Sequence, residues 1–414
     1  MIRLRPLQPH LFTLGLGIFA LGAVATEAAA ATRSVGAGKT YAMPCSAFAA
    51  AADGDTIEIE GSQTYQGDVC GITRNNLTIR GVNGRPKIDA NNMQAMGKGT
   101  WVVIGNGTII ENVEMFGAKV RDKNGAALRL DGHHLTLRGS YLHDNENGIL
   151  TNNDGVSDIV IENSEFGHNG YGDGYSHNLY VGHVNSLIFR NSYSHDAKVG
   201  HNLKSRAKFN TILYSRFSST APGQGSPSGQ PSYEIDLPNA GTSYVIGNVI
   251  EQPALNQNPN LLGYGEEGAT NPGKDLYVVN NTFINDNASK GNFILVGSTV
   301  GVPVLIQNNI FAGAGTLTNQ ANAIKQSNHQ SAVPAFINRA TYDLRPAPGA
   351  PMINAGTAAG LSPLGFSLTP TAQYKHVAAS EARPVASVID IGAYEVGRSP
   401  GANMTPTTFL LLDQ

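Results

Sequence analysis

The sequence predicts an all-β fold: a right-handed parallel β-helix (a solenoid) with an N-terminal capping helix and a loop-rich C-terminal cap. One strand–bend–strand phrase recurs along the chain, helix-forming stretches are few, and glycine is abundant, with 48 residues among 414. Hydrophobic residues make up 41% and charged residues 14%, a balance typical of a folded chain. The formal net charge of −3 gives no general attraction to nucleic acid or to anionic membranes.

The first 31 residues have the order of a secretory signal peptide. A basic start is followed by an apolar centre from Leu11 to Val24 and then by small residues. A retained membrane anchor is the alternative, although the apolar run is shorter than the ~20 residues that span a bilayer. We therefore expect a secreted or periplasmic bacterial protein that has no membrane contact after signal cleavage.

The N-terminal end of the solenoid holds the two cysteines of the chain, Cys45 and Cys70. After export they are candidates for a disulfide that staples this end, and two unpaired thiols are the alternative. The stretch SAFAAAA at 46–52 favours a helix, which would cover the open first coil.

The repeated phrase has alternating apolar residues, then Gly, Asn or Ser, then one or two further apolar residues. Copies include LTLRGSYL, IVIENSEF, LIFRNSYS, YVIGNVIE and LIQNNIFA, at a spacing of roughly 24 to 33 residues. Period-two alternation is typical of strands, and units this short must stack to bury their apolar side. Propellers and leucine-rich solenoids compete with this interpretation, but their sequence signatures are missing. We expect the coils over residues 32–330 and a capping region and tail over 331–414.

The bends between strands predict stacked side chains. Asparagine tolerates left-handed backbone and can hydrogen-bond the Asn of the next coil. This predicts a ladder of Asn163, Asn191, Asn248, Asn281 and Asn309.

A second set of turns carries His-Asp or His-Asn pairs, at 143–144, 168–169 and 195–196. Because they recur at one place in the repeat, we interpret them as stacked turn residues. Such turns also offer hard oxygen ligands, so calcium is a secondary candidate cofactor, with Asp144, Glu146 and Asp173 as its candidate ligands. The spacing of an EF-hand loop is missing.

The third strand of each coil carries the residues suited to chemistry. The aligned copies are AALRLDG (126–132), NGILTNN (147–153), HNLYVGH (177–183), HNLKSRA (201–207) and YEIDLPN (233–239). With the central Leu or Ile of each copy inward, alternation places one outward column about 4.8 Å apart per coil. That column contains Arg129, Leu150, Tyr180, Lys204 and Asp236. We place Asn178, Asn202 and Glu234 in a second outward column, and Arg206, His177, His183 and His201 beside the first.

Two insertions, 217–232 and 251–275, interrupt the repeat next to this surface and are expected to wall a groove. Amides, local positive charge and tyrosines suit a polysaccharide there. The tyrosines are Tyr171, Tyr175, Tyr180, Tyr233 and Tyr264. Uronic acid units are the expected partners of Lys204 and Arg206.

Residues 39–395 resemble the pectate-lyase-like superfamily of secreted parallel β-helix proteins that act on carbohydrates. GDTIEIEGSQTY, NLTIRG, GRPKIDA, the I-x-N-S-x-F phrases and DIGAYE carry this resemblance. HNLKSRAKFN is also similar to a strand of the chondroitinase B and alginate lyase family, which implies that Lys204 is the base. That family has acidic calcium ligands before the lysine and an arginine on the following coil. This chain has His201 and Asn202 before the lysine, and Glu234 and Asp236 on the following coil.

The mechanism expected is β-elimination on an acidic polysaccharide. A lyase must neutralise the uronate carboxylate, remove the carbon-5 proton and assist departure of the 4-linked oxygen. We expect Lys204 to be the base, with a pKa lowered by repulsion from Arg206. Arg206, assisted by Asn178 or Asn202, would hold the carboxylate, and Tyr180, His177 or His201 would protonate the leaving oxygen. The internal rival makes His and Tyr the base and acid, with Lys204 binding the carboxylate.

Other functions use the same surface. A glycoside hydrolase would need a carboxylate pair, for which Glu234 and Asp236, or Asp173, are the candidates. A C5-epimerase would abstract the same proton without cleavage. A glycan-binding solenoid would need no base, and Lys204 and Arg206 would then be a solvated edge. We expect a monomer, since the solenoid pairs most of its own strand edges.

Overall fold

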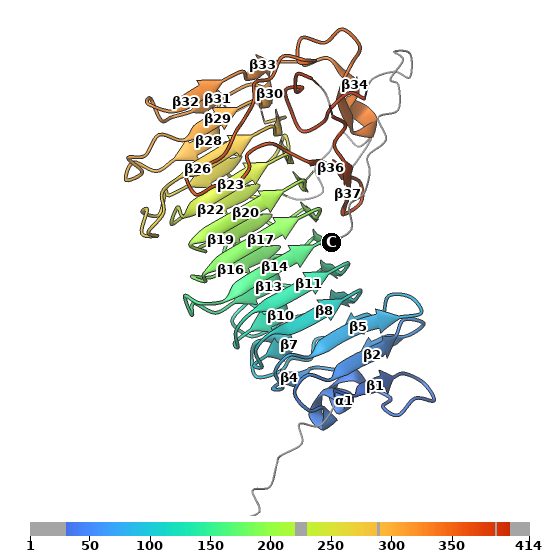
Figure 1. Cartoon of the computed structure of the whole chain (residues 1–414). Coiled ribbons are helices and arrows are strands. Elements are labelled where there is room, and N and C mark those ends of the chain that lie inside the picture. Colours follow the sequence, from blue (N-terminus) through green and yellow to red (C-terminus); the bar gives the residue numbers. More distant parts are fainter. Residues whose placement is uncertain (1–29, 220–229, 288–289, 386, 398–414) are drawn as a thin grey trace, which may run out of the picture.

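The computed structural model describes residues 30–219, 230–287, 290–385 and 387–397, and these form a right-handed parallel β-helix (Figure 1). Three parallel sheets of 12, 11 and 10 strands run along the solenoid, here called A, B and C. Each coil contributes one strand to each sheet, so neighbouring strands come from successive coils. The predicted fold class is confirmed.

Sheet A is the longest. Its strands are β1 (Thr32–Val35), β2 (Thr56–Glu60), β5 (Thr78–Val82), β8 (Thr108–Glu111), β11 (Leu135–Arg138), β14 (Asp158–Glu162), β17 (Ser186–Arg190), β20 (Phe209–Leu213), β23 (Thr242–Ile246), β26 (Leu276–Val279), β29 (Leu305–Gln307) and β32 (Ile324–Gln326).

Sheet B follows each sheet A strand after a tight bend. Its strands are β3 (Thr64–Gln66), β6 (Lys87–Asp89), β9 (Glu114–Phe116), β12 (Tyr141–His143), β15 (Glu165–Gly167), β18 (Tyr193–His195), β21 (Arg216–Ser218), β24 (Val249–Gln252), β27 (Thr282–Asn285), β30 (Ile310–Gly313) and β33 (His329–Ser331).

Sheet C completes each coil and contains the strands aligned above. They are β4 (Cys70–Ile72), β7 (Gly99–Val103), β10 (Ala126–Leu130), β13 (Asn147–Thr151), β16 (Leu179–Val181), β19 (Leu203–Ser205), β22 (Ile235–Leu237), β25 (Leu262–Tyr264), β28 (Asn292–Val296) and β31 (Thr316–Thr318).

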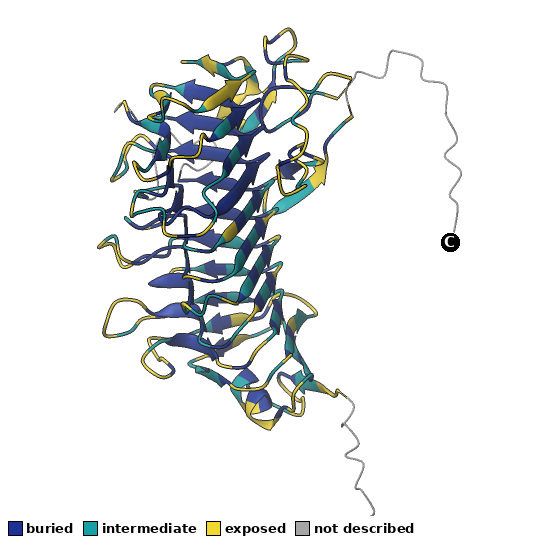
Figure 2. Ribbon diagram, turned by 60° about the vertical axis from the view of Figure 1, so that its left-hand side comes forward, coloured by how far each residue is buried: buried dark blue, intermediate teal, exposed yellow. Residues whose placement is uncertain are grey.

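The core lies inside the coils, which Figure 2 shows as a buried interior along the whole solenoid. The residues predicted to point inward from sheet C, Leu128, Ile149, Leu179, Leu203 and Ile235, are all fully buried. Alternation along short strands therefore fixes which side chains face the core and which face outward.

The bend between sheets A and B carries a ladder that differs in part from the prediction. Asn248, Asn281 and Asn309 form the expected ladder, in which each side chain oxygen accepts the backbone N–H of the coil before it. In the preceding coils serines take this place, and Ser164 and Ser192 accept the same bond. Asn163 and Asn191 instead occupy the left-handed position one residue earlier, with φ of 48° and 53°. The prediction was wrong for these two, because the left-handed residue and the stacking residue are neighbours.

The His-Asp turns follow the ends of sheet B strands, as expected. Asp144 and Asp196 have left-handed backbone, and each carboxylate contacts the preceding histidine, His143 or His195. The same local bond in two coils makes these pairs part of the scaffold.

The N-terminal end is closed by α1 (Pro44–Ala50), close to the predicted helix. Phe48 of α1 packs edge-on against Trp101 in the first coils, with ring centroids 5.1 Å apart. Cys45 and Cys70 form a disulfide that joins the helix to β4. The proposed signal peptide, residues 1–31, lies almost wholly outside the described residues.

The segment after β33 contains η1 (Arg339–Thr341) and two small antiparallel pairs, β34 (Phe336–Asn338) with β35 (Asp343–Pro346) and β36 (Ala372–Lys375) with β37 (Ala379–Ala382). We expected it to close the last coil. The segment makes apolar contacts along the outer sides of sheets A and B. Phe366 stacks on Tyr244 of sheet A, with ring centroids 4.1 Å apart, and Leu344 packs on Val249 of sheet B.

No helix in the described part of the chain is both long and apolar enough to cross a membrane.

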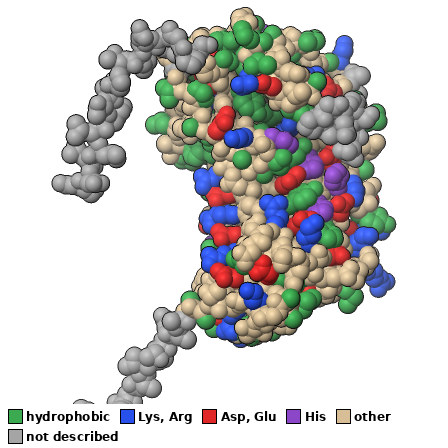
Figure 3. Space-filling view, turned by 90° about the vertical axis from the view of Figure 1, so that its right-hand side faces the viewer, with side chains coloured by type: hydrophobic (Ala, Val, Ile, Leu, Met, Phe, Trp, Pro, Cys, Tyr) green, Lys and Arg blue, Asp and Glu red, His purple; other side chains and the backbone are tan. Residues whose placement is uncertain are grey.

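A column of charged side chains of alternating sign runs along sheet A, with one side chain from each of six successive strands. In register these are Glu58, Arg80, Glu111, Arg138, Glu162 and Arg190. Arg138 is 2.9 Å from Glu162 and 3.2 Å from Glu111, and Arg190 also pairs with Glu162. Figure 3 shows basic and acidic side chains alternating along this side of the molecule. This column is called the sheet A charge column below.

Candidate functional site

The predicted outward column of sheet C is present. Register pairs Arg129 with Leu150, Leu150 with Tyr180, Tyr180 with Lys204 and Lys204 with Asp236. The next partner of Asp236 is Gly263 of β25. Residues far apart in sequence therefore meet on one face, and Tyr180, Lys204 and Asp236 lie on three successive coils.

Two cations of this face share one carboxylate. Lys204 Nζ lies 2.8 Å from Oε1 of Glu267, and Arg206 Nη2 lies 2.6 Å from Oε2 of the same side chain. Arg206 also donates from Nε to the Tyr180 hydroxyl at 2.9 Å and from Nη1 to Asn239. The Lys204 and Arg206 side chains are 10% and 15% exposed, whereas that of Glu267 is 46% exposed. We call Lys204 and Arg206 the cation pair, and Glu267 supplies the carboxylate that they share.

The expected lowering of the Lys204 pKa was wrong for this arrangement. Burial acts to lower the pKa, but attraction to Asp236 and hydrogen bonds to Glu267 and Asp236 outweigh it and raise the pKa above its ordinary value. Lys204 Nζ is 2.9 Å from Asp236 Oδ2. Repulsion from Arg206 is countered because Glu267 lies between the two cations. Lys204 is therefore protonated while Glu267 is in place.

The histidines of the site are neutral hydrogen-bond donors. His177 and His201 stack with ring centroids 4.6 Å apart, and burial lowers the pKa of both, that of His201 to about 3. Nδ1 of His177 accepts the N–H of His201, and Nδ1 of His201 accepts the N–H of Tyr233. The proton of each neutral ring must then lie on Nε2. His201 Nε2 is 3.2 Å from Asp236. Neither ring has a free lone pair for a substrate proton, so His177 and His201 are poor bases.

A second carboxyl group, that of Glu266, contacts Asp236. Burial, followed by a hydrogen bond to Asp236, raises the pKa of Glu266 to about 10, so Glu266 is protonated at neutral pH. Both carboxyl oxygens of Glu266 and Oδ1 of Asp236 are buried without another hydrogen-bond partner, which fits one proton held between the two groups. Gly263 makes room for this pair, because a Cβ there would lie 2.3 Å from Glu266 Oε1.

The second predicted column is not on the outer face. Asn178, Asn202 and Glu234 are at most 1% exposed and form an internal ladder. Asn178 donates to Asn202 at 2.9 Å, and Asn202 donates to Glu234. Burial raises the pKa of Glu234 well above its ordinary range. Each of the three precedes a short sheet C strand, where the backbone is still turning and strict alternation does not hold. They cannot contact a substrate.

The remaining candidates lie around the edge of the site. Arg129 shares the column but is paired with Asp131 at 3.1 Å, two coils from Tyr180. His183 is exposed, and burial followed by the charge of Arg206 lowers its pKa. Tyr233 packs on His201, with ring centroids 5.4 Å apart. Tyr171 and Tyr175 are exposed, whereas Tyr264 is fully buried and cannot line a groove.

The candidate calcium ligands are engaged separately. Glu146 is buried and accepts the backbone N–H groups of Val120 and Gly125. Asp144 contacts His143 and Lys198, and Asp173 accepts the N–H of Tyr175. Among the described residues, the one group of three close enough to share a metal is His168, His195 and Asp196. Both ring nitrogens of His195 already contact carboxylates, Asp196 and Glu165.

Sequence reasoning missed Glu266, Glu267 and Asn239. The insertion 251–275 was expected to form a wall beside Lys204, and it supplies both glutamates. Continuing the strand alignment by one coil would have paired LGY of β25 with IDL of β22 and placed these residues just beyond the column. Residues 220–229 of the other insertion lie outside the described residues.

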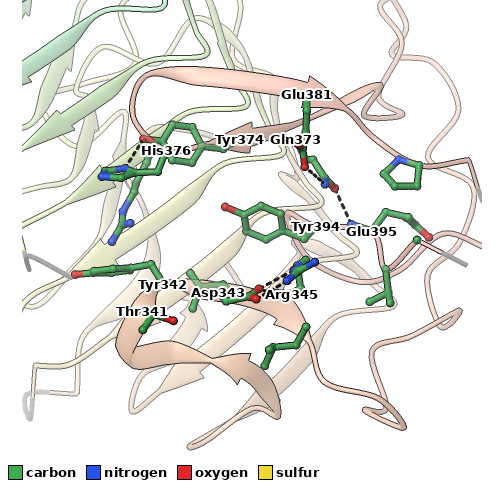
Figure 4. Close-up of a pocket in the computed structure, with 16 residues that line it drawn as sticks. Thr341, Tyr342, Asp343, Arg345, Gln373, Tyr374, His376, Glu381, Tyr394 and Glu395 are labelled. Carbon is green, nitrogen blue, oxygen red and sulfur yellow. Dashed lines mark hydrogen bonds and ion pairs between the residues drawn. The ribbon is translucent and has the colours of Figure 1, made fainter. Parts of the chain in front are cut away.

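A separate pocket of about 580 Å³ lies against the outer side of sheet B (Figure 4). Arg216 of β21 and the C-terminal segment line it, including Tyr342, Tyr374, His376 and Tyr394. The Arg216 guanidinium lies 3.4 Å from the centroid of the Tyr342 ring. None of the predicted site residues lines this pocket.

Comparison with known proteins gives a fold relationship. No protein-family profile and no curated protein matches the chain. The solved structure of pectate lyase Pel9A is similar, with a TM-score of 0.58 and 17% identity over 84% of this chain and 90% of that one. A protein of Geobacillus virus E2, ORF18, aligns at a TM-score of 0.40 and 13% identity over 69% of this chain and 56% of that one. The chain thus has a pectate-lyase-like parallel β-helix fold.

Proposed function

We propose that the protein is a secreted lyase that cleaves a uronic-acid-containing polysaccharide by β-elimination. The observation that carries this proposal is the cation pair, since Lys204 and Arg206 together hold both oxygens of one carboxylate on an outward sheet face. A substrate uronate presents the same group. The fold shared with a pectate lyase supports the choice of a carbohydrate-active site and does not itself assign the chemistry.

Roles within the site follow from the contacts. Arg206 stays charged and holds the substrate carboxylate. Lys204, which is protonated in the resting site, shares that carboxylate, then releases one proton to solvent, and its neutral amine takes the carbon-5 proton. The Tyr180 hydroxyl, oriented by Arg206, or Nε2–H of His177 faces the departing oxygen. Asp236 is a positioning residue for Lys204 and His201.

The site gives little support to a hydrolase. Glu234 is buried in the internal ladder, and Asp236 is 2% exposed with its second oxygen next to Glu266. A substrate and an attacking water cannot reach such a pair.

No acidic residue stands directly before the proposed base in the sequence to hold calcium, and the two acidic side chains beside it, Asp236 and Glu267, contact Lys204 itself. The acidic residues expected to hold it before a catalytic lysine are missing, since His201 and buried Asn202 stand there. The proposed elimination therefore uses side chains of this chain alone, and a chelator is expected to leave turnover unchanged.

Export is part of the proposal. Residues 1–31 have the order of a signal peptide, and the Cys45–Cys70 disulfide suits an oxidising compartment. We also propose that the protein acts as a monomer.

The test is a panel of acidic polysaccharides incubated with the purified mature chain. An ultraviolet absorbance of unsaturated uronate is expected, and Lys204→Ala is expected to abolish it while leaving the circular dichroism spectrum unchanged. New reducing ends without that absorbance would indicate a hydrolase, and an exchanged carbon-5 proton without cleavage an epimerase. Binding with none of these would leave a glycan-binding solenoid.

A further inference from the structure

We infer that Glu267 occupies the position of a substrate carboxylate, and that a uronate enters the site by exchanging with it. This inference deepens the proposed function and makes Glu267 a specificity-determining residue. It rests on the geometry of three side chains, on their unequal exposure and on the balance of charge.

The geometry is that of a bound ligand. Each oxygen of Glu267 contacts a different cation, at 2.8 Å from Lys204 and 2.6 Å from Arg206. These cations come from β19 and the residues just after it, whereas Glu267 comes from the insertion two coils further along. A loop therefore places this carboxylate against the sheet, at the position where the carboxylate of a substrate would bind.

Exposure makes the exchange feasible. Lys204, Arg206 and Asp236 have side chains between 2% and 15% exposed, and each has further partners in the scaffold. Glu267 is 46% exposed, and its carboxylate accepts hydrogen bonds from the two cations. Its backbone N–H donates to Pro238 O at 3.0 Å. A change of side-chain rotamer is thus enough to release the carboxylate without moving the loop.

The charge balance limits what can replace it. Lys204 and Arg206 carry two positive charges, and Asp236 and Glu267 carry two negative ones. Glu266 is neutral, because burial and the bond to Asp236 raise its pKa to about 10, and His177 and His201 are neutral as well. Departure of Glu267 alone leaves one net positive charge in a half-buried site. A uronate restores neutrality and a neutral sugar does not, so exchange selects anionic sugar units.

The experiment is titration of the folded protein with D-galacturonate, a soluble carboxylate probe, in wild type, Glu267→Gln and Glu162→Gln. Wild type must break two charge-assisted hydrogen bonds to admit the probe, so E267Q is expected to bind it about tenfold more tightly. E162Q is the matched control: it removes a carboxylate that two arginines share in the sheet A charge column, outside the site, and its affinity for galacturonate should stay within about twofold of wild type. Galactose, which lacks the carboxylate, should show no gain with E267Q.

Equal galacturonate affinity in wild type and E267Q, or no binding to E267Q up to the solubility limit, would overturn the inference. Its failure is separable from that of the proposed function. Tighter binding by E267Q without unsaturated product from any polysaccharide would retain the exchange and reject the lyase. Unsaturated product from wild type, with neither galacturonate affinity nor KM changed in E267Q, would retain the lyase and reject the exchange.

Discussion

The sheet A charge column and the sheet C column are both stacks of in-register side chains, but their charges are balanced differently. On sheet A the sign alternates from coil to coil, so Arg138 finds Glu111 on one side and Glu162 on the other. On sheet C, Lys204 and Arg206 lie two residues apart in one coil, and the column itself supplies only Asp236. The missing negative charge arrives on Glu267, from an insertion.

This difference separates scaffold from site. A column that neutralises itself offers nothing to a ligand, because every charge already has a partner that the repeat holds in place. The sheet C column depends on one exposed side chain that a ligand can replace. Strand register alone therefore does not distinguish scaffold from site in this solenoid. The two columns differ in whether the compensating charge comes from the repeat itself or from an insertion.

Lys204→Arg should give the largest effect. Arginine keeps the positive charge but cannot release its proton at neutral pH, so formation of unsaturated product should fall by roughly 10³-fold if Lys204 is the base. Arg190→Lys, the matched change in the sheet A charge column, should leave the rate unchanged. Retention of more than about a tenth of the rate by K204R would assign Lys204 to carboxylate binding and leave Tyr180 as the base.

Glu266→Gln should give an intermediate effect, on stability. The folded pKa of Glu266 is about 10, above its ordinary 4.5, so between these values the native state holds a proton that the unfolded chain has lost. Stability of the wild type should fall as pH rises through this window, and E266Q removes the effect while its amide still donates to Asp236. The gain in unfolding free energy should grow with pH and reach roughly 1–3 kcal/mol at pH 8. Urea unfolding at pH 5 and pH 8 measures it, and a gain that does not grow with pH would show that Glu266 is ionised at neutral pH.

Glu162→Gln should give the smallest effect. Burial acts to raise the Glu162 pKa, but hydrogen bonds to Arg138 and Arg190 outweigh it and lower the pKa. Glu162 thus stabilises the native state fully above the ordinary carboxyl pKa, and this stabilisation is lost as pH falls through the lowered pKa of Glu162. Because both arginines are nearly half exposed, the loss should be about 1 kcal/mol or less and shrink at high salt. Urea unfolding at two salt concentrations measures it, and any loss of turnover would place sheet A in the site.

The coils and the column could be predicted from the sequence because their signals are local and repeated. An inward Leu or Ile in every aligned sheet C strand fixes the register, and this register is enough to bring Tyr180, Lys204 and Asp236 together. Asn178 and Asn202 were misplaced because alternation fails where the backbone turns into a strand of three residues.

The electrostatics of the site could not be predicted in the same way. The Lys204 pKa depends on burial, on Asp236 and on Glu267. Glu267 belongs to an insertion without a period, so it has no register to extrapolate. The neutral state of Glu266 depends on its burial beside Asp236, which Gly263 permits. Such effects arise from tertiary contacts between coils and loops.

A crystal structure of Glu267→Gln with bound D-galacturonate tests the central claim most directly. The account predicts that the sugar carboxylate lies between Lys204 Nζ and Arg206 Nη2, with its ring over the Tyr180 side of sheet C. A carboxylate bound elsewhere, such as in the tyrosine-lined pocket beside Arg216 on sheet B, with the substituted side chain at position 267 still between the two cations, would contradict it.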